Sequence, residues 1–363
     1  MRMKKCRLCG FPYLLSKMIR WRDNGTISFT IMPDFRLILL ESQMMTDIYS
    51  HIEENMGISI SHLVFEAQRN AVRWALDSLL NKFPVSLGRV GPNKQLAVRI
   101  FCRLSVWLGC GYVKGLHYRS KRYGEALIRN PFDRDLLTAI ILGAFESLER
   151  RHFENEWKMI GGDEVIRVTT SDAKPEFSKR LEIDLQPSRD GDLALSRCPS
   201  CGVPANLAYL DWREEEGEII DNRRGQRMII IDPYSGSAVF RELEKELGED
   251  IFPLIINAGK DYARDRILEP GGVSDNGGKI SAEDREVFYR KSLRLLPLWG
   301  YGNPVSLHHE EGRLEITIEN PFNKYLLAGY IAALFEAVDG AESKVTWESP
   351  QHYSITFIAR ADA

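Results

Sequence analysis

Apolar residues in the second half of the chain follow a helical period first and a strand period afterwards. Segments 237–247, 252–267 and 282–296 carry apolar residues three or four positions apart, which predicts three amphipathic helices. From Trp299 onwards the period becomes two, and apolar residues alternate with polar ones over 314–319. This alternation predicts half-buried antiparallel strands that start at Trp299.

Further elements flank this pattern on both sides. A compact apolar run at 228–231 predicts a strand before the first helix. After the turn Asn320-Pro321-Phe322, segment 325–338 predicts an apolar helix, and 344–347 with 353–358 predicts a terminal hairpin. The order predicts an α/β (α+β) fold in which an antiparallel sheet packs against helices.

The first half of the chain repeats this order of periods. We expect its elements at the same relative places, with the same antiparallel sheet and the same final helix. They are helices near 47–55, 61–80 and 93–104, strands from Val106 and from Tyr123, and a helix over 134–149.

Short sequences also recur between the halves. Asn130-Pro131-Phe132-Asp133 matches Asn320-Pro321-Phe322-Asn323 at a distance of 190 residues, and the opening CxxCG sequences lie 192 apart. A fixed distance between similar segments indicates a tandem duplication. We therefore predict two mixed units, 1–170 and 198–363, related by pseudo-twofold symmetry.

Residues 171–197 between the units are predicted to form an exposed linker. They contain Pro175, Pro187 and many charges, which is typical of connecting segments. Within them, the alternation over Leu181–Leu185 predicts a strand at a sheet edge.

Composition narrows the class of protein. Of the 363 residues 44% are hydrophobic and 27% charged, and the net charge is -3, which argues against a general nucleic-acid binder. No apolar run approaches the roughly 20 residues of a membrane span, and no apolar signal core opens the chain. We expect a cytoplasmic protein without a membrane span.

The strongest chemical signal is a pair of CxxCG motifs, because two thiolates at this spacing converge on one metal ion. Neither pair is complete alone, so we predict one tetrahedral Zn2+ site shared by both units. Basic neighbours of the motifs, such as Lys5 and Arg197, are expected to offset its negative charge. The predicted ligands are Cys6, Cys9, Cys198 and Cys201.

Three other interpretations of these cysteines stay open at this point. Four thiolates also hold an iron-sulfur cluster. Each pair could be a redox dithiol, although no strand-CxxC-helix context of the thioredoxin kind surrounds it. The cysteines could also simply pack. His308 and His309 are less suited to a metal, since adjacent residues of a strand point to opposite faces.

The alternating strand, the Asn-Pro-Phe turn, the apolar helix and the terminal hairpin together resemble the hydrocarbon-binding, 4-vinyl reductase domain family. Trp299-Gly300-Tyr301 fits the same pattern, with Cys110-Gly111-Tyr112 as its counterpart in the first unit. The resemblance implies a small apolar ligand held between helices and sheet. It also implies binding more often than catalysis, although one branch is tied to bacteriochlorophyll synthesis.

We therefore predict a sensor or accessory protein that binds a small apolar or aromatic ligand and carries a structural zinc, rather than an enzyme. Two alternatives stay open: an enzyme or metal- or electron-handling maturation factor of a tetrapyrrole or other cofactor pathway, and a scaffold that binds a partner protein. The second unit is favoured as the binder, with the glycine-rich loop 271–278 interpreted as a lid. Its expected ligand contacts are Tyr262, Phe288, Trp299 and Tyr301.

Overall fold

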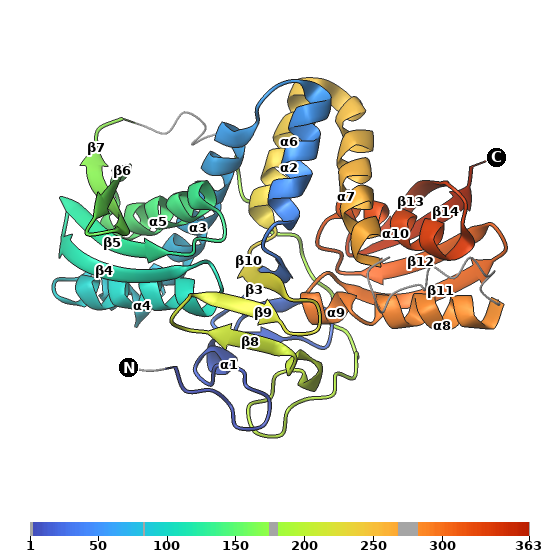
Figure 1. Cartoon of the computed structure of the whole chain (residues 1–363), viewed down its shortest axis with the longest axis horizontal. Coiled ribbons are helices and arrows are strands. Elements are labelled where there is room, and N and C mark those ends of the chain that lie inside the picture. Colours follow the sequence, from blue (N-terminus) through green and yellow to red (C-terminus); the bar gives the residue numbers. More distant parts are fainter. Residues whose placement is uncertain (1–2, 83, 174–180, 268–281, 363) are drawn as a thin grey trace.

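The protein has an α+β fold, as the sequence predicts, with three antiparallel sheets that pack against helices (Figure 1). The structure is a computed structural model and describes residues 3–82, 84–173, 181–267 and 282–362. A six-stranded sheet lies at the centre, and a four-stranded sheet lies on each side of it (Figure 1). We call each lateral sheet with its helices a wing.

The central sheet joins strands from both halves of the chain. Its order is β1-β2-β3-β10-β9-β8, and its two middle strands pair antiparallel, with Leu39 opposite Ile230. The two middle strands, β3 and β10, carry buried apolar residues on both faces, and the wings and helices cover these faces. The strands are β1 (Ile19–Trp21), β2 (Ile27–Phe29), β3 (Met32–Glu41), β8 (Leu210–Arg213), β9 (Glu218–Asp221) and β10 (Gln226–Ile231).

The two wings have the same order of elements, except that α8 and α9 of the second wing stand where the first wing has α4. The first, on the left of Figure 1, contains α3 (Ser61–Leu80), α4 (Asn93–Trp107), β4 (Tyr112–Arg119), β5 (Tyr123–Arg129), α5 (Arg134–Glu149), β6 (His152–Ile160) and β7 (Asp163–Ser171). The second, on the right, contains α7 (Ile251–Ile267), α8 (Ala282–Leu293), α9 (Leu296–Trp299), β11 (Asn303–Glu310), β12 (Arg313–Glu319), α10 (Lys324–Asp339), β13 (Ser343–Gln351) and β14 (Ser354–Ala361).

Within the described residues, three α-helices lie outside the wings. Helices α2 (Met44–Met56) and α6 (Tyr234–Leu247) stand together above the central sheet (Figure 1). Helix α2 follows strand β3 and belongs to the first half of the chain, and helix α6 follows strand β10 and belongs to the second half. The short α1 (Leu15–Met18) lies below the sheet, near the cysteine motifs.

The repeated Asn-Pro-Phe turn has a local physical cause. Asn130 and Asn320 both adopt a left-handed backbone, with φ of 49° and 52°, which asparagine tolerates better than most residues. Three residues later, the Asp133 side chain accepts a hydrogen bond from the backbone of α5, and Asn323 does the same for α10. The motif therefore ends a strand and caps the next helix.

Each half of the central sheet packs against the wing of the other half. Buried Arg36 on β3 donates to backbone carbonyls in two loops of the second wing, and Arg227 on β10 donates to the matching carbonyls of the first wing. The two arginines lie 191 residues apart. The acceptors are Gly300, Asn320 and Pro321 for Arg36, and Gly109, Asn130 and Pro131 for Arg227.

Tryptophans reinforce the same crossed contact. The indole of Trp21 on β1 donates to the carbonyl of Leu298 in the second wing at 2.8 Å. The indole of Trp212 on β8 donates to the carbonyl of Trp107 in the first wing at 2.9 Å. The shared central sheet and these crossed contacts thus hold the two halves together.

Close backbone contact at Gly217 predicts a measurable cost of substitution. A β-carbon there would lie 2.0 Å from the Tyr112 nitrogen of the first wing, whereas one at Gly225 would meet nothing within 4 Å. Both glycines have the same left-handed φ, 71° and 70°. We expect Gly225→Ala to cost about 1 kcal/mol in unfolding free energy and Gly217→Ala about 2 kcal/mol more, as measured by urea denaturation. Equal losses would contradict the close contact.

Several predicted boundaries were wrong. The first strands of the wings begin at Tyr112 and Asn303, not at Val106 and Trp299, because the preceding helices continue to Trp107 and Trp299. The predicted edge strand over 181–185 does not form, and Leu181 is instead buried in the core.

The counterpart of Cys110 is also different from the predicted one. Gly109 and Gly300 share φ values of 82° and 77°, and Gly111 and Gly302 share 137° and 127°. Cys110 therefore matches Tyr301, not Trp299.

Candidate metal centre and ligand cavity

Each CxxCG motif folds into a tight turn around its two sulfurs. In the first motif, the Cys6 amide donates to Phe11 and the Gly10 amide donates back to Cys6, at 2.8 and 2.9 Å. The second motif has the same two hydrogen bonds at the same lengths, through Cys198 and Gly202. Gly10 and Gly202 have φ of 74° and 80°, a conformation that favours glycine. The glycine at the end of each CxxCG motif is thus needed to close the turn.

The two turns bring all four predicted cysteines together, and these four could bind one metal ion. Their sulfurs lie within 4.8 Å of one another, and all four side chains are buried. Cys6 and Cys198 are 3.8 Å apart, and Cys9 and Cys201 are 3.4 Å apart. Four thiolates at about 2.3 Å from a tetrahedral zinc would lie about 3.8 Å from each other. The spacing therefore fits a single ion.

Backbone amides distinguish the two positions of each motif. Burial raises the pKa of Cys6, but hydrogen bonds from the Leu8 amide and the Ser200 side chain outweigh it and lower that pKa to about 6. At Cys9, burial dominates and raises the pKa of the thiol. The second motif behaves alike, since amides lower the pKa of its first cysteine and burial raises that of its second. A bound cation would favour the thiolate at all four positions.

The basic residues beside the motifs do not act on the thiols as predicted. Lys5 forms an ion pair with Asp211 at 3.1 Å. Arg197 pairs with Asp23 and also donates to backbone carbonyls. Lys5 therefore pairs with strand β8 and Arg197 with the loop between β1 and β2, and the hydrogen bonds that lower the pKa of Cys6 and Cys198 come from the two cysteine turns.

An apolar cavity with a volume of about 460 Å³ lies between the central sheet and the second wing. All four aromatic residues predicted as ligand contacts line it. Tyr262 comes from α7, Phe288 from α8, and Trp299 and Tyr301 from the segment between α8 and β11. A volume of this size is typical of small-molecule sites.

The first half of the chain also contributes to this cavity. The end of β3 and the start of α2 supply Leu39, Leu40, Glu41 and Met44. The sequence pattern did not indicate these residues, because they lie more than 200 positions from Tyr262 and reach it only through the pairing of β3 with β10.

Glu41 forms the polar end of the cavity. One carboxylate oxygen accepts from Arg224 at 2.9 Å, and the other accepts from Arg266 at 3.1 Å and from the Tyr262 hydroxyl. Burial, followed by the charge of Glu41, raises the pKa of Tyr262, so this phenol stays protonated and donates. The Arg266 guanidinium lies 3.8 Å above the Tyr262 ring.

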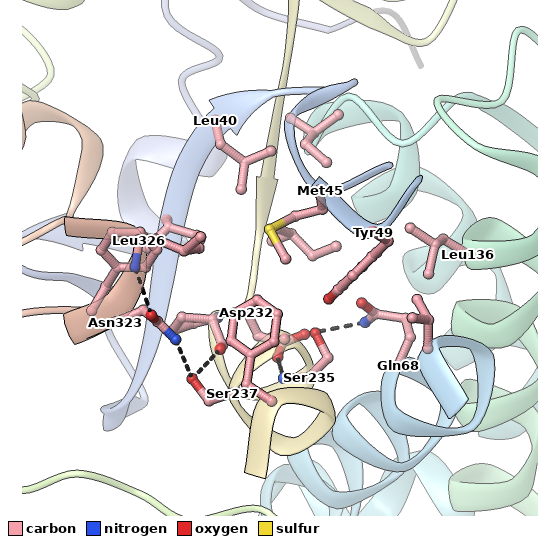
Figure 2. A pocket seen from close by; sticks show the side chains of 18 of the residues that line it. Leu40, Met45, Tyr49, Gln68, Leu136, Asp232, Ser235, Ser237, Asn323 and Leu326 are labelled. Atoms are coloured by element: carbon pink, nitrogen blue, oxygen red, sulfur yellow. Dashed lines mark hydrogen bonds between the residues drawn. The ribbon is translucent and has the colours of Figure 1, made fainter. Parts of the chain in front are cut away.

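A smaller cavity of about 30 Å³ lies where α2, α3, α6 and α10 approach each other (Figure 2). Here Gln68 donates to buried Asp232 at 3.1 Å. Gln68 lies 191 positions before Gly259, and Asp232 lies 191 positions after Glu41. Gly259 and Glu41 both line the larger cavity. The volume suits a water molecule rather than an organic ligand.

Among the described residues, the four cysteines are the group that could hold a metal ion, and the two adjacent histidines do not form a second one. His308 is 79% exposed and His309 only 9%, which confirms that they point to opposite faces. His309 lies 3.2 Å from Asp339 and so has a structural partner. The glycine-rich loop 271–278 lies outside the described residues.

No family model and no curated protein matches the chain. Among solved structures, the phenol-responsive sensory domain of the transcription activator PoxR, in complex with phenol, is similar over 43% of this chain and 87% of that domain. The two are 17% identical, with a TM-score of 0.34, which carries no argument about function. In the part of the chain that the structure describes, no helix is long and apolar enough to cross a membrane.

Proposed function

We propose that this protein binds a small apolar or aromatic molecule in the 460 Å³ cavity, as a sensor or accessory protein. The observation that carries the proposal is the position of Tyr262, Phe288, Trp299 and Tyr301, which were expected to touch a ligand and all line this one cavity. Apolar walls with a few polar groups at one end are the usual features of such sites.

We further propose that the four cysteines bind one zinc ion as a structural staple. The sulfur spacing supports a single ion, because in an iron-sulfur cluster the four thiolates are divided between two or more irons and do not all lie this close together. The zinc site would connect the beginning of the first half to the beginning of the second half, below the sheet that the two halves share. A brown chromophore in anaerobically purified protein would instead favour the iron-sulfur alternative and electron transfer.

The resemblance to the 4-vinyl reductase family and the duplication of units 1–170 and 198–363 are also proposals. Paired contacts support the duplication. Lys94 forms an ion pair with Glu149 at 2.7 Å, and Arg285 forms one with Asp339 at 2.8 Å. Arg285 lies 191 residues after Lys94, and Asp339 lies 190 residues after Glu149.

Ligand binding should raise thermal stability. Screening aromatic and isoprenoid compounds, 2-naphthalenemethanol among them, is expected to find compounds that stabilise the folded state. At a concentration one hundred times the dissociation constant, linkage gives about 2.7 kcal/mol. Differential scanning calorimetry measures this shift.

A cavity-filling variant tests whether such stabilisation comes from this site. Ser292→Phe adds a ring inside the cavity, whereas Val287→Phe adds the same ring at a position on α8 that is 65% exposed. We expect Ser292→Phe to abolish the ligand-induced shift and Val287→Phe to keep it. A shift that survives in Ser292→Phe would place the ligand elsewhere.

A further inference from the structure

Basic side chains are concentrated around the first cysteine motif. The first 22 residues contain seven lysines and arginines and no aspartate or glutamate. In the whole chain, by contrast, the 51 acidic residues outnumber the 48 basic ones. The segment around the first motif is therefore suited to an anionic partner, although the protein as a whole is acidic.

This segment folds as a short hairpin whose tip is the cysteine turn. The Tyr13 amide donates to the Lys4 carbonyl at 2.8 Å and closes the hairpin at its base. Arg7 and Leu8 stand between the two cysteines and so lie at the tip. Figure 1 shows the segment at the lower end of the molecule, below the central sheet and on the side opposite to α2 and α6. The hairpin is thus placed to meet a large partner.

The hairpin exposes large apolar side chains. Leu8 at the tip is 66% exposed, and Leu14 and Tyr13 beyond the base are 45% and 43% exposed. The residues that hold the hairpin on the core are different ones, and they are buried: Cys6, Cys9 and Phe11. Clustered apolar side chains that do not pack in the core are typical of an interaction surface.

Exposed cations lie among these apolar side chains. The Lys17 ammonium is 5.1 Å from the centre of the Tyr13 ring, Lys4 is bound to the Tyr13 amide, and Arg7 precedes Leu8. Lys5 is not counted with them, because it pairs with Asp211 at 3.1 Å. We call the exposed cations and apolar side chains together the hairpin surface: Lys4, Arg7, Leu8, Tyr13, Leu14 and Lys17.

The second cysteine motif folds in the same way but has a different surface. Its hairpin is closed by the Ala205 amide, which donates to the Ser196 carbonyl at 2.8 Å. The positions 192 residues after Lys4, Arg7, Leu8, Tyr13 and Leu14 hold Ser196, Pro199, Ser200, Ala205 and Asn206. The cations and apolar side chains of the hairpin surface are therefore not required to form the cysteine turn.

We propose that the hairpin surface binds the face of a membrane that contains anionic lipids. Leu8 and Leu14 enter the boundary between headgroups and acyl chains, and Tyr13 lies at the level of the headgroups. The cations beside them bind lipid phosphates. A nucleic acid would attract the same cations, but the exposed leucines would gain nothing from it, so they favour lipid. This proposal does not depend on a ligand in the cavity.

Vesicle sedimentation tests the proposal directly. The whole protein is expected to bind vesicles of three parts phosphatidylcholine and one part phosphatidylglycerol. Binding to vesicles of phosphatidylcholine alone should be at least tenfold weaker, because the cations then face no net charge. Added salt should weaken binding to the anionic vesicles, since it screens exposed charges.

Substitutions taken from the second motif separate the apolar from the charged contribution. Leu8→Ser with Leu14→Asn introduces the side chains of Ser200 and Asn206, which this type of hairpin accommodates. We expect at least tenfold weaker binding to anionic vesicles and an unchanged unfolding temperature. Lys4→Ser with Arg7→Gln should weaken binding about 25-fold, because each cation near such a membrane contributes about fivefold.

Two control variants change similar side chains elsewhere. Met159→Ser removes an apolar side chain of β6 that is also 66% exposed, and Arg99→Gln removes an exposed cation of α4. Both should bind vesicles like the original protein. Equal weakening by these controls would show that the hairpin surface has no special role.

The remaining outcomes contradict the proposal. If anionic vesicles are not bound, or if Leu8→Ser with Leu14→Asn binds them unchanged, the membrane proposal is wrong. A loss of binding that appears only together with a lowered unfolding temperature would also overturn it. If a single-stranded oligonucleotide is bound while vesicles are not, the hairpin surface is a nucleic-acid site instead.

Discussion

Replacing Cys9 with serine is expected to remove the whole metal content of the protein, not half of it. The four sulfurs lie within 4.8 Å of one another and form one ligand set, so neither motif keeps an ion alone. Structural zinc contributes about 10–16 kcal/mol in small finger domains. In this protein the central sheet also holds the two cysteine-containing segments in place. We therefore expect a smaller loss in unfolding free energy, on the order of 5 kcal/mol.

Elemental analysis and urea denaturation of the purified variant measure both effects. Cys102→Ser is the matched control, because Cys102 is a partly buried thiol outside the group of four. It should keep one equivalent of metal. Half an equivalent remaining in Cys9→Ser would indicate two separate sites, and an unchanged content would show that these cysteines do not bind the metal.

Arg36→Met is expected to cost about 4 kcal/mol in unfolding free energy, because hydrogen bonds from a charged donor contribute about 1.5–3 kcal/mol each and their buried acceptors would lose them. Arg36 is buried and binds three carbonyls of the second wing, at Gly300, Asn320 and Pro321. Urea denaturation curves should show this loss. In the absence of urea, the variant should keep its native secondary structure.

Arg227→Met is the matched comparison at the other end of the shared sheet. Arg227 makes the same three kinds of hydrogen bond, but its side chain is 18% exposed, so water partly replaces it. We expect a loss of about 2 kcal/mol, given the smaller desolvation of the carbonyls left behind. A loss at Arg227 equal to or larger than that at Arg36 would contradict the role assigned to burial.

The sequence pattern pointed to aromatic residues that line the cavity, but it did not point to the polar end of the cavity. Phe288, Trp299 and Tyr301 are apolar residues on segments whose helical or strand period is visible in the chain. Glu41 ends a strand of the other half, and nothing near it in the sequence distinguishes it from a surface glutamate. Its role depends on Arg224 and Arg266, which only the fold brings to it.

The sequence by itself determined the features whose causes lie within a few residues. The helices follow from apolar spacing, the Asn-Pro-Phe turns from a left-handed asparagine and a helix cap, and the cysteine turns from a glycine and two amide hydrogen bonds. Such interactions form between near neighbours and leave a readable local pattern.

Only the tertiary structure decided which elements meet across the chain. Pairing of β3 with β10 joins segments about 190 residues apart, and the crossed hydrogen bonds of Arg36 to Asn320 and of Arg227 to Asn130 span 284 and 97 residues. A strand's own sequence specifies which face is apolar but not which partner covers it. The partner is selected by the burial gained when the whole sheet assembles, which is why the shared sheet and the Glu41 end of the cavity could not be derived from local pattern alone.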